Sequence, residues 1–308
     1  MNKERVLVTG GSGFLGSHLC KNLETSGYEV RVFDLKPSND QETIIGDLRD
    51  QDGIQLKNAL QGVNAVMHLA GSIEAEESFR EPKKYVQNNI LGSFNLLEAM
   101  REAKINKLIF SSSAAVYGEP ASIPISESAI IHPINTYGAT KAAVESLMSS
   151  YAYSYGFSAV ALRYFNIYGP GENHIPETHL IPRFIYMMKK GMDLTIWGDG
   201  NDVRDYVHVG DVAAAHILAL NLEKGFQPIN LSGGKGKSIN DMVYLISDQL
   251  KINPSVSYLP KRPGDPTVLR ADTQKAKKLL NWEATINLED GLRETVDYFE
   301  GREIVIDK

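Results

Sequence analysis

The chain has 308 residues, of which 43% are hydrophobic and 23% are charged, and its formal net charge is -6 at pH 7. This length and composition identify a globular protein with one large or two modest domains. Because charges of both signs are spread without long blocks, the sequence shows no basic footprint for nucleic acid or for an anionic membrane.

The compartment follows from the cysteine content and the apolar runs. Cys20 is the single cysteine of the sequence and cannot form an internal disulfide, which favours a reducing environment. No run approaches the roughly 20 apolar residues of a membrane span, and no charged segment followed by an apolar stretch begins the chain. We therefore expect a cytoplasmic protein without nucleic-acid or membrane partners.

The first predicted unit is a strand, a glycine-rich turn and a helix over residues 6–19, VLVTGGSGFLGSHL. Apolar residues fill positions 6–8 and recur at helical spacing from position 14. The turn contains four glycines, Gly10, Gly11, Gly13 and Gly16. Glycine has no Cβ, so this turn can bring backbone N–H groups and a helix N-terminus against an anion such as a dinucleotide pyrophosphate.

An acidic residue ends the second predicted strand, 29–33. Asp34 lies 18 residues beyond Gly16 and could accept hydrogen bonds from both hydroxyls of an adenosine ribose. Its charge would repel a 2′-phosphate, which favours NAD over NADP. A strand-end turn residue is the alternative interpretation of Asp34, and Lys36 leaves NADP open.

A second acidic residue follows the short predicted strand 43–45. In a doubly wound sheet, Asp47 would share the carboxyl edge with Asp34, where it could accept from an adenine amino group while Leu48 covers the ring. The alternative role for Asp47 is to cap a helix near 52–60.

The next strand, 65–69, leads into small residues that would let a cofactor lie close to the backbone. His68 stands in the middle of this strand and is interpreted as a packed histidine rather than a catalytic one. A long helix is predicted over 82–103. Asn88 and Asn89 are poor helix formers within it, which suggests that at least one has a polar task near the sheet edge.

Hydroxyl groups gather after strand 107–110, in the run of three serines that ends at Ser113. A loop then leads to a helix over 137–155, which opens with Tyr137 and Lys141 on one face because four residues span about one turn. A lone Y-x-x-x-K is common by chance. The serine-rich strand end and the preceding dinucleotide turn make it significant here.

With a strand at 157–163, six alternating strand and helix units predict an α/β fold with a Rossmann-type, doubly wound parallel sheet. We expect residues 1–168 to form the dinucleotide-binding domain, with 205–232 returning to its sheet. Beyond residue 169 the pattern loosens, so 169–308 are expected mainly to form a smaller, irregular substrate domain.

Several motifs together resemble the extended short-chain dehydrogenase/reductase family, in particular its NAD-dependent nucleotide-sugar 4-epimerases of the UDP-glucose/UDP-galactose type. The resemblance covers nearly the whole chain and includes TGGSGFLGSH, GDLRD, HLAG, NNILGSFNLLEA, FSSSAAVYG, YGATK, LRYFNIYGPG, VRDYVHVGDVA and RPGD. It implies an NAD-dependent isomerase, a UDP-sugar substrate, no metal, and a homodimer that pairs the helices over 82–103 and 137–155.

The resemblance also implies which residues bind the cofactor. Those expected to contact NAD are Gly10, Gly13, Phe14, Leu15, Gly16, Asp34, Asp47, Leu48, Leu69, Ala70, Gly71, Asn88, Ser111, Tyr137, Lys141 and Phe165. Within this set, the glycines would contact the pyrophosphate and Asn88 the nicotinamide side.

Ser113, Tyr137 and Lys141 are implied as the catalytic group. A free tyrosine has a pKa near ~10, too high for a base at neutral pH. Lysine one turn away and the positive nicotinamide ring would lower that value and favour the phenolate. Tyr137 could then take the proton of the sugar 4-hydroxyl while its C4 hydride passes to NAD⁺. Ser113 would hydrogen-bond the same oxygen, and the 4-keto sugar would turn over and take the hydride back.

Substrate contacts carry over less evenly. Those expected are Ser113, Tyr137, Asn166, His179, Leu180, Trp197, Arg204, Arg262 and Leu269. The two arginines suit a diphosphate because their planar forks bind it through paired hydrogen bonds, although surface salt bridges are the alternative. His179 stands where some members have asparagine, and Leu269 where some have tyrosine. The smaller leucine predicts activity on UDP-N-acetylglucosamine as well as UDP-glucose.

Three other functions stay open. A nucleotide-sugar 4,6-dehydratase or decarboxylase would need a further acid or base, and here Ala114 and Ala115 follow Ser113 where such enzymes carry Asp or Glu. A ketosugar reductase would exchange its cofactor in every cycle. A non-catalytic nucleotide-binding protein would have no reason to keep all three catalytic residues.

Overall fold

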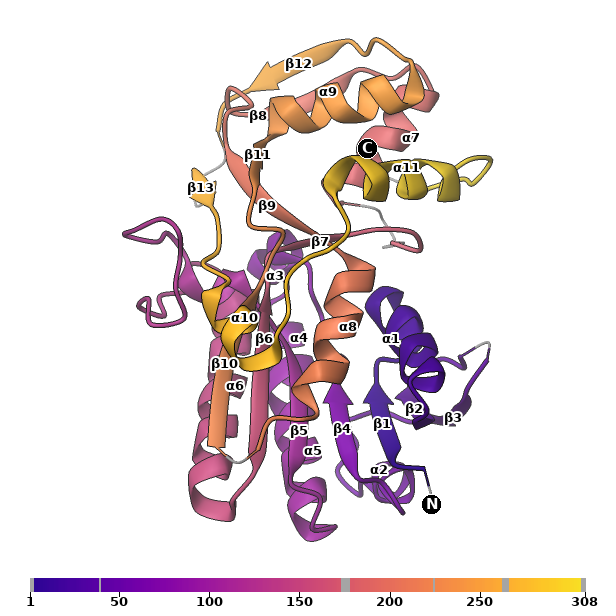
Figure 1. The fold of residues 1–308 in the computed structure, drawn as a ribbon, viewed down its shortest axis with the longest axis vertical. Coiled ribbons are helices and arrows are strands. Elements are labelled where there is room, and N and C mark those ends of the chain that lie inside the picture. The colour runs from indigo at the N-terminus through magenta and orange to yellow at the C-terminus, as the bar shows by residue number, and fades with distance from the viewer. Residues whose placement is uncertain (1–2, 39, 173–177, 224, 262–265, 306–308) are drawn as a thin grey trace.

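The computed structural model describes residues 3–38, 40–172, 178–223, 225–261 and 266–305 (Figure 1). A large parallel sheet occupies one part, and a smaller part stands over the carboxyl ends of its strands. Arg262, one of the two arginines expected to bind the diphosphate, lies outside the described residues.

Seven parallel strands form the large sheet in the order β10-β6-β5-β4-β1-β2-β3. They are β1 (Arg5–Thr9), β2 (Glu29–Asp34), β3 (Glu42–Ile45), β4 (Ala65–His68), β5 (Lys107–Ser113), β6 (Ser158–Tyr164) and β10 (Gly225–Leu231). All seven residues of β6 are buried, as expected of a strand covered by helices on both faces. The predicted doubly wound α/β fold is therefore confirmed.

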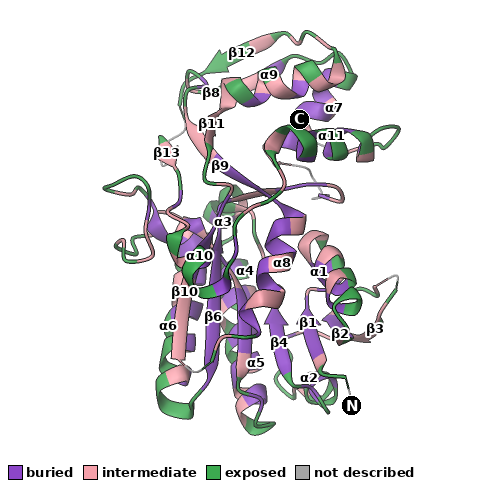
Figure 2. Ribbon diagram, in the orientation of Figure 1, coloured by how far each residue is buried: buried purple, intermediate pink, exposed green. Residues whose placement is uncertain are grey.

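The two faces of the sheet have separate cores because successive side chains of a strand point to opposite faces. Val6 and Val8 pack under α1 (Phe14–Thr25), α8 (Val209–Ala219) and α10 (Gln274–Leu280). Leu7 points the other way, under α2 (Ile54–Ala59), α5 (Gly92–Glu102) and α6 (Thr136–Tyr155). Figure 2 shows the strands buried between these helices. Cys20 is fully buried in the first of these cores.

The helix predicted over 82–103 is divided. It begins as α4 (Pro82–Tyr85), passes through a π-helical segment, η1 (Val86–Leu91), and continues as α5. A short helix that the sequence pattern did not predict, α3 (Ala75–Arg80), precedes it. The π-helical segment contains Asn88 and Asn89, which are the two poor helix formers of the predicted helix.

Among the described residues, the smaller part contains three helices and two small sheets above the large one (Figure 1). Its helices α7 (Leu180–Lys189), α9 (Ile239–Leu250) and α11 (Leu288–Tyr298) share one apolar core. The four-stranded sheet contains β7 (Asn166–Tyr168), β9 (Val203–His208), β11 (Gly236–Ser238) and β13 (Val268–Leu269). A pair of strands, β8 (Leu194–Trp197) and β12 (Val256–Leu259), lies beside it.

The segment 205–232 contributes to both sheets. Its last strand, β10, pairs in parallel with β6 and forms an edge of the large sheet. Its first residues belong instead to β9, which pairs with β7, β11 and β13 at the centre of the four-stranded sheet. Through the described ranges, every helix is too short or too polar to cross a bilayer.

Candidate active site

The glycine turn after β1 is built for close approach to the backbone. Gly10 has φ +74°, and a Cβ there would lie 2.7 Å from the backbone nitrogen of Ala70. A Cβ on Gly16 would lie 2.3 Å from the carbonyl oxygen of Gly10. Helix α1 begins after Gly13 with no side-chain cap, so its first N–H groups are not bonded by a cap residue. This is the arrangement that binds a phosphate at a helix N-terminus.

Asp34 lies beside this turn, at the end of β2. Its Oδ2 accepts from the backbone N–H of Ser12 at 3.0 Å, and its Oδ1 accepts from that of Lys36 at 3.2 Å. Both hydrogen bonds fix the carboxylate near the turn, where a ribose adjoining a bound pyrophosphate could donate to it. The residues therefore fit the adenosine end of NAD. Phe14 and Leu15, also expected at the cofactor, are the first two residues of α1.

Asp47 is held by Arg49, whose side-chain hydrogen bonds keep the pKa of the carboxyl below its usual value. It does not cap α2, because that helix begins after Gly53. The capping alternative is therefore wrong. Leu48 is buried near the start of α5, and its carbonyl accepts from Asn95 Nδ2 at 2.7 Å.

The loop after β4, with Leu69, Ala70 and Gly71, is tied to helix α6 by a buried asparagine. Asn89 Oδ1 accepts from the backbone N–H of Ser72 at 2.8 Å, and its Nδ2 donates to Thr140 Oγ1 at 2.9 Å. Asn88, the residue expected at the nicotinamide side, is half-buried and donates to the Ser72 hydroxyl at 2.8 Å. The pair of asparagines in a predicted helix was the sequence signal for these polar contacts. It did not show that Asn89 is the residue that joins the loop to α6.

His68 is a packed residue, as the sequence suggested. It is 1% exposed, and its ring nitrogens lie 2.7 Å from Thr9 Oγ1 and 2.8 Å from Ser93 Oγ. Burial lowers its pKa to about 3, with a smaller contribution from the charge of Lys141. A neutral imidazole with both nitrogens occupied is unsuited to proton transfer.

The structure brings Ser113, Tyr137 and Lys141 together at the carboxyl edge of the large sheet. Ser113 ends β5 and hydrogen-bonds the Tyr137 side chain. Lys141, one turn further along α6, donates to the carbonyl oxygen of Ser111 at 2.7 Å, and its Nζ lies 5.7 Å from the centre of the Tyr137 ring. Asn135 fixes the start of α6 by accepting from the backbone N–H of Gly138 at 2.8 Å.

The electrostatics of Ser113, Tyr137 and Lys141 correct the expectation that the surroundings of Tyr137 lower its pKa. Desolvation raises the pKa of Tyr137 to about 12, although the Ser113 hydrogen bond acts in the opposite direction, and the charge of Glu74 raises it further. Desolvation lowers the pKa of Lys141 to about 8, against the charge of Glu145. Burial of the Tyr137 phenol therefore outweighs the Ser113 hydrogen bond, so the protein alone does not bring the pKa of this tyrosine toward neutral pH. Oxidised nicotinamide supplies further positive charge when NAD is bound.

A buried ionic network below Lys141 escaped the sequence analysis. Glu145 is one turn beyond Lys141 on α6, 5% exposed, and accepts from Arg163 Nε at 2.9 Å and from the Ser112 hydroxyl at 2.6 Å. Arg163 also donates to the Tyr117 hydroxyl at 2.8 Å. The sequence signal that could have placed Glu145 next to Lys141 is the spacing of Tyr137, Lys141 and Glu145 at every fourth residue.

The remaining expected contacts lie on the four-stranded sheet and next to it. Asn166 is in β7, and Arg204 in β9 is in register with Leu269 in β13. Leu269 packs against the cluster that contains Ala114 and Phe165, and Ala114 directly follows Ser113. Trp197 ends β8 and is 40% exposed.

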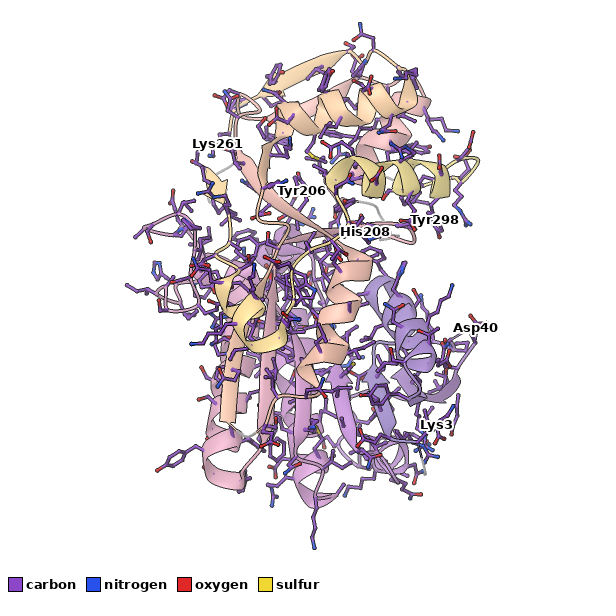
Figure 3. All side chains as sticks on the ribbon, in the orientation of Figure 1. Lys3, Asp40, Tyr206, His208, Lys261 and Tyr298 are labelled. Atoms are coloured by element: carbon purple, nitrogen blue, oxygen red, sulfur yellow. The ribbon has the colours of Figure 1, made fainter. Side chains whose placement is uncertain are left out.

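Figure 3 places Tyr206 and His208 along β9, between the two parts of the molecule, and Lys261 near β13. Lys261 Nζ donates to Asp202 Oδ1 at 2.8 Å and to Thr267 Oγ1 at 3.1 Å. Over the described ranges, the His, Cys, Asp and Glu side chains form no group of three or more that could hold a metal ion.

His179 and Leu180 stand at the start of α7, and the histidine has two acidic neighbours that the sequence analysis did not identify. Its Nδ1 lies 2.6 Å from Glu172 Oε1, and its Nε2 lies 3.3 Å from Glu74 Oε1. Although desolvation opposes the charge, hydrogen bonds to both carboxylates raise the pKa of His179 well above its usual value.

A glycine turn for a pyrophosphate, an acidic residue for a ribose and a serine, tyrosine and lysine group at one sheet edge define a dinucleotide-dependent enzyme of the Rossmann class. A sequence model of the NAD dependent epimerase/dehydratase family matches residues 6–232. The chain belongs to this family, and NAD is its cofactor. The resemblance to the extended short-chain dehydrogenases/reductases is thereby confirmed.

Known relatives match along almost their whole length. The UDP-glucose 4-epimerase of Rhizobium meliloti (strain 1021) is 36% identical over 311 residues, with 94% of each chain covered. The structure of the Thermus thermophilus UDP-glucose 4-epimerase complex with NAD has a TM-score of 0.89 at 35% identity, covering 96% of this chain and 99% of that one. The UDP-N-acetylglucosamine 4-epimerase from Methanobrevibacter ruminantium, in complex with UDP-N-acetylmuramic acid, has a TM-score of 0.89 at 37% identity, covering 97% and 99%.

Proposed function

We propose that the protein is an NAD-dependent UDP-sugar 4-epimerase that interconverts UDP-glucose and UDP-galactose. The observation that carries this proposal is the meeting of Ser113, Tyr137 and Lys141 at the sheet edge that also carries the glycine turn and Asp34. The relatives' names support the same activity.

In the proposed mechanism, Tyr137 takes the proton of the sugar 4-hydroxyl, and Ser113 hydrogen-bonds the same oxygen. Lys141 remains protonated by donating to the Ser111 carbonyl and favours the tyrosinate by its charge. The glycine turn and Asp34 would hold NAD, which would supply reversible hydride transfer at the sugar C4. Asn166, Trp197 and Arg204 hold the nucleotide while the 4-keto sugar turns, and Tyr137 then gives the proton back.

We infer that the sugar site also accepts an N-acetyl group at C2. Leu269 is half-buried against the cluster of Ala114 and Phe165, and it is smaller than the tyrosine found in some members of the family. The similarity to a UDP-N-acetylglucosamine 4-epimerase agrees with this wider substrate range.

We also propose that the protein is a homodimer. Several apolar side chains of the segment 82–103 are exposed, with Val86 at 46%, Leu91 at 42% and Phe94 at 41%. Tyr153 on α6 is 94% exposed. Burial of these groups against a second copy would pair the two helical segments, as the resemblance implies.

The test is to incubate the purified protein with a panel of UDP-hexoses, without added cofactor, and to separate the products by chromatography. We expect interconversion at C4 only, because a catalytic cycle that returns the hydride needs no external reductant. Dehydrated or reduced products would instead support the dehydratase or the reductase. Tyr137→Phe should retain bound NAD but lose epimerisation at least ~100-fold. Full activity in this variant would refute the mechanism.

A further inference from the structure

The start of α7 is joined to the cofactor-binding part by a chain of polar contacts between residues far apart in sequence. Glu74 precedes α3, in the segment after β4, and His179 precedes α7. Besides the His179 contact at 3.3 Å, Glu74 Oε2 accepts from the Thr178 hydroxyl, 104 residues away. The backbone carbonyl of Glu74 accepts from the Tyr85 hydroxyl at 2.6 Å.

On its other side, His179 is held by a carboxylate that is almost fully enclosed. The Glu172 side chain is 2% exposed, and its Oε1 lies 2.6 Å from His179 Nδ1. Both imidazole nitrogens therefore face carboxylate oxygens, an arrangement that a doubly protonated ring satisfies by donating twice. His179 is thus engaged by protein groups on both nitrogens rather than directed only at a ligand.

The segment that contains Glu74 also lies next to Tyr137, through the ring of Tyr85. Tyr137 faces Lys141 on its own helix, Ser113 from β5, and Glu74 and Tyr85 from the segment around α3 and α4. The Tyr85 ring packs edge-to-face on the Tyr137 ring, with 6.5 Å between centres. The negative charge of Glu74 opposes ionisation of the Tyr137 phenol.

We propose that the Glu74–His179–Glu172 bridge is a positioning device for the reaction, in which the two carboxylates hold His179 and thereby fix the start of α7. The inference rests on the proposed epimerase function and assigns roles to Glu74 and Glu172 as positioning residues. His179, expected from the resemblance as a substrate contact, acts in this account by holding α7 in place.

The bridge itself is tested by His179→Asn, which cannot contact both carboxylates in the same way. We expect KM for UDP-glucose to rise about fivefold or more, with a smaller change in kcat, because α7 would be less firmly positioned. The double variant Glu74→Gln/His179→Asn should bind no more weakly than His179→Asn alone, since both changes break one bridge. Strictly additive effects, or an unchanged KM in His179→Asn, would contradict the proposal.

A binding measurement separates this inference from the proposed function. Calorimetric titration of the NAD-loaded protein with UDP needs no turnover, and His179→Asn should weaken UDP binding by about the same factor as KM. If wild-type protein fails to interconvert UDP-glucose and UDP-galactose, the proposed function fails while this titration still tests the bridge. Equal affinity of wild type and His179→Asn for UDP would refute the bridge whatever the catalytic result.

Discussion

At the scale of single residues, Lys141 is a charged side chain in a site where burial opposes its charge. Its pKa is lowered from 10.5 to about 8 in the native state. The unfolded chain therefore binds this proton more tightly, so the lysine destabilises the native state below pH 8 and the penalty fades as the pH rises toward 10.5. In the proposed mechanism this charge favours the tyrosinate form of Tyr137.

This argument predicts that Lys141→Met is inactive but more stable at neutral pH. We expect the free energy of unfolding to increase by about 1–3 kcal/mol at pH 7, and the difference from wild type to shrink at pH 10. Urea unfolding of both nucleotide-free proteins at the two pH values measures it. A variant that is less stable at pH 7 would show that the Ser111 hydrogen bond outweighs desolvation.

Leu269 carries the prediction on substrate range. Leu269→Tyr adds a ring where we expect the C2 substituent, so kcat/KM for UDP-N-acetylglucosamine should fall about tenfold or more relative to UDP-glucose. Leu269→Met, similar in volume, is the control and should keep the ratio. The two sugars compared in one competition assay give the ratio directly, and equal losses on both would argue against a steric role.

Single residues also show where sequence reasoning ends. Ser113, Tyr137, Lys141 and Asp34 could be recognised because each stands in a motif with fixed local spacing. Glu74 carries no such signal, because its contacts with Thr178 and His179 join loops about one hundred residues apart. Glu172 is only seven residues from His179 but stands in no motif that marks it. The direction of the Tyr137 pKa shift also depended on burial, which spacing does not reveal.

At the scale of elements, the β1 turn and α1 form a unit in which Gly16 allows close packing of helix and turn. Gly16→Ala would place a Cβ 2.3 Å from the Gly10 carbonyl oxygen, a backbone atom that cannot rotate away. We expect the protein to lose its bound NAD and to be destabilised by about 1–3 kcal/mol through overpacking. NAD released on acid denaturation and the thermal midpoint measure the two effects. Retained NAD would mean that α1 can shift without loss.

Gly27→Ala provides a control in the same region. Gly27 follows α1 at φ +91° with nothing within 4 Å of a built Cβ, so only local backbone strain is expected. It should lower the thermal midpoint while retaining NAD. A loss of NAD in both variants would indicate general destabilisation of α1 rather than a damaged phosphate site.

Apart from the divided helix over 82–103, most of the predicted helices and large-sheet strands correspond closely to the structure, because most of them are long or strongly apolar. Helix α6, predicted over 137–155, spans Thr136–Tyr155. The strands of the smaller sheets were missed. Strand β13 has two residues and β11 has three, and their pairing with β9 is set by tertiary contacts rather than by a local pattern.

At the scale of the whole molecule, the dimer proposal predicts a change of assembly. Phe94→Glu places a charge among the exposed apolar side chains of 82–103 and should convert a dimer into a monomer, because burying an unpaired carboxylate at an interface is unfavourable. Sedimentation velocity measures the change, and Tyr258→Glu, an exposed site on β12, is the control. Wild-type protein that sediments as a monomer would refute the proposal.

The return of β10 to the large sheet has a consequence for how such enzymes can diversify. The first six strands of the large sheet are followed in sequence by β7, α7, β8 and β9, which belong to the smaller part. The seventh strand, β10, then returns to the large sheet, and α9 belongs to the smaller part again. A truncation after residue 168 would remove β10 and α8 from the large part of the molecule and would leave the edge of β6 without its pairing strand. The residues above the large sheet are therefore not one continuous segment that could be exchanged as a unit. Substrate specificity in this fold would change through substitutions in several separate segments.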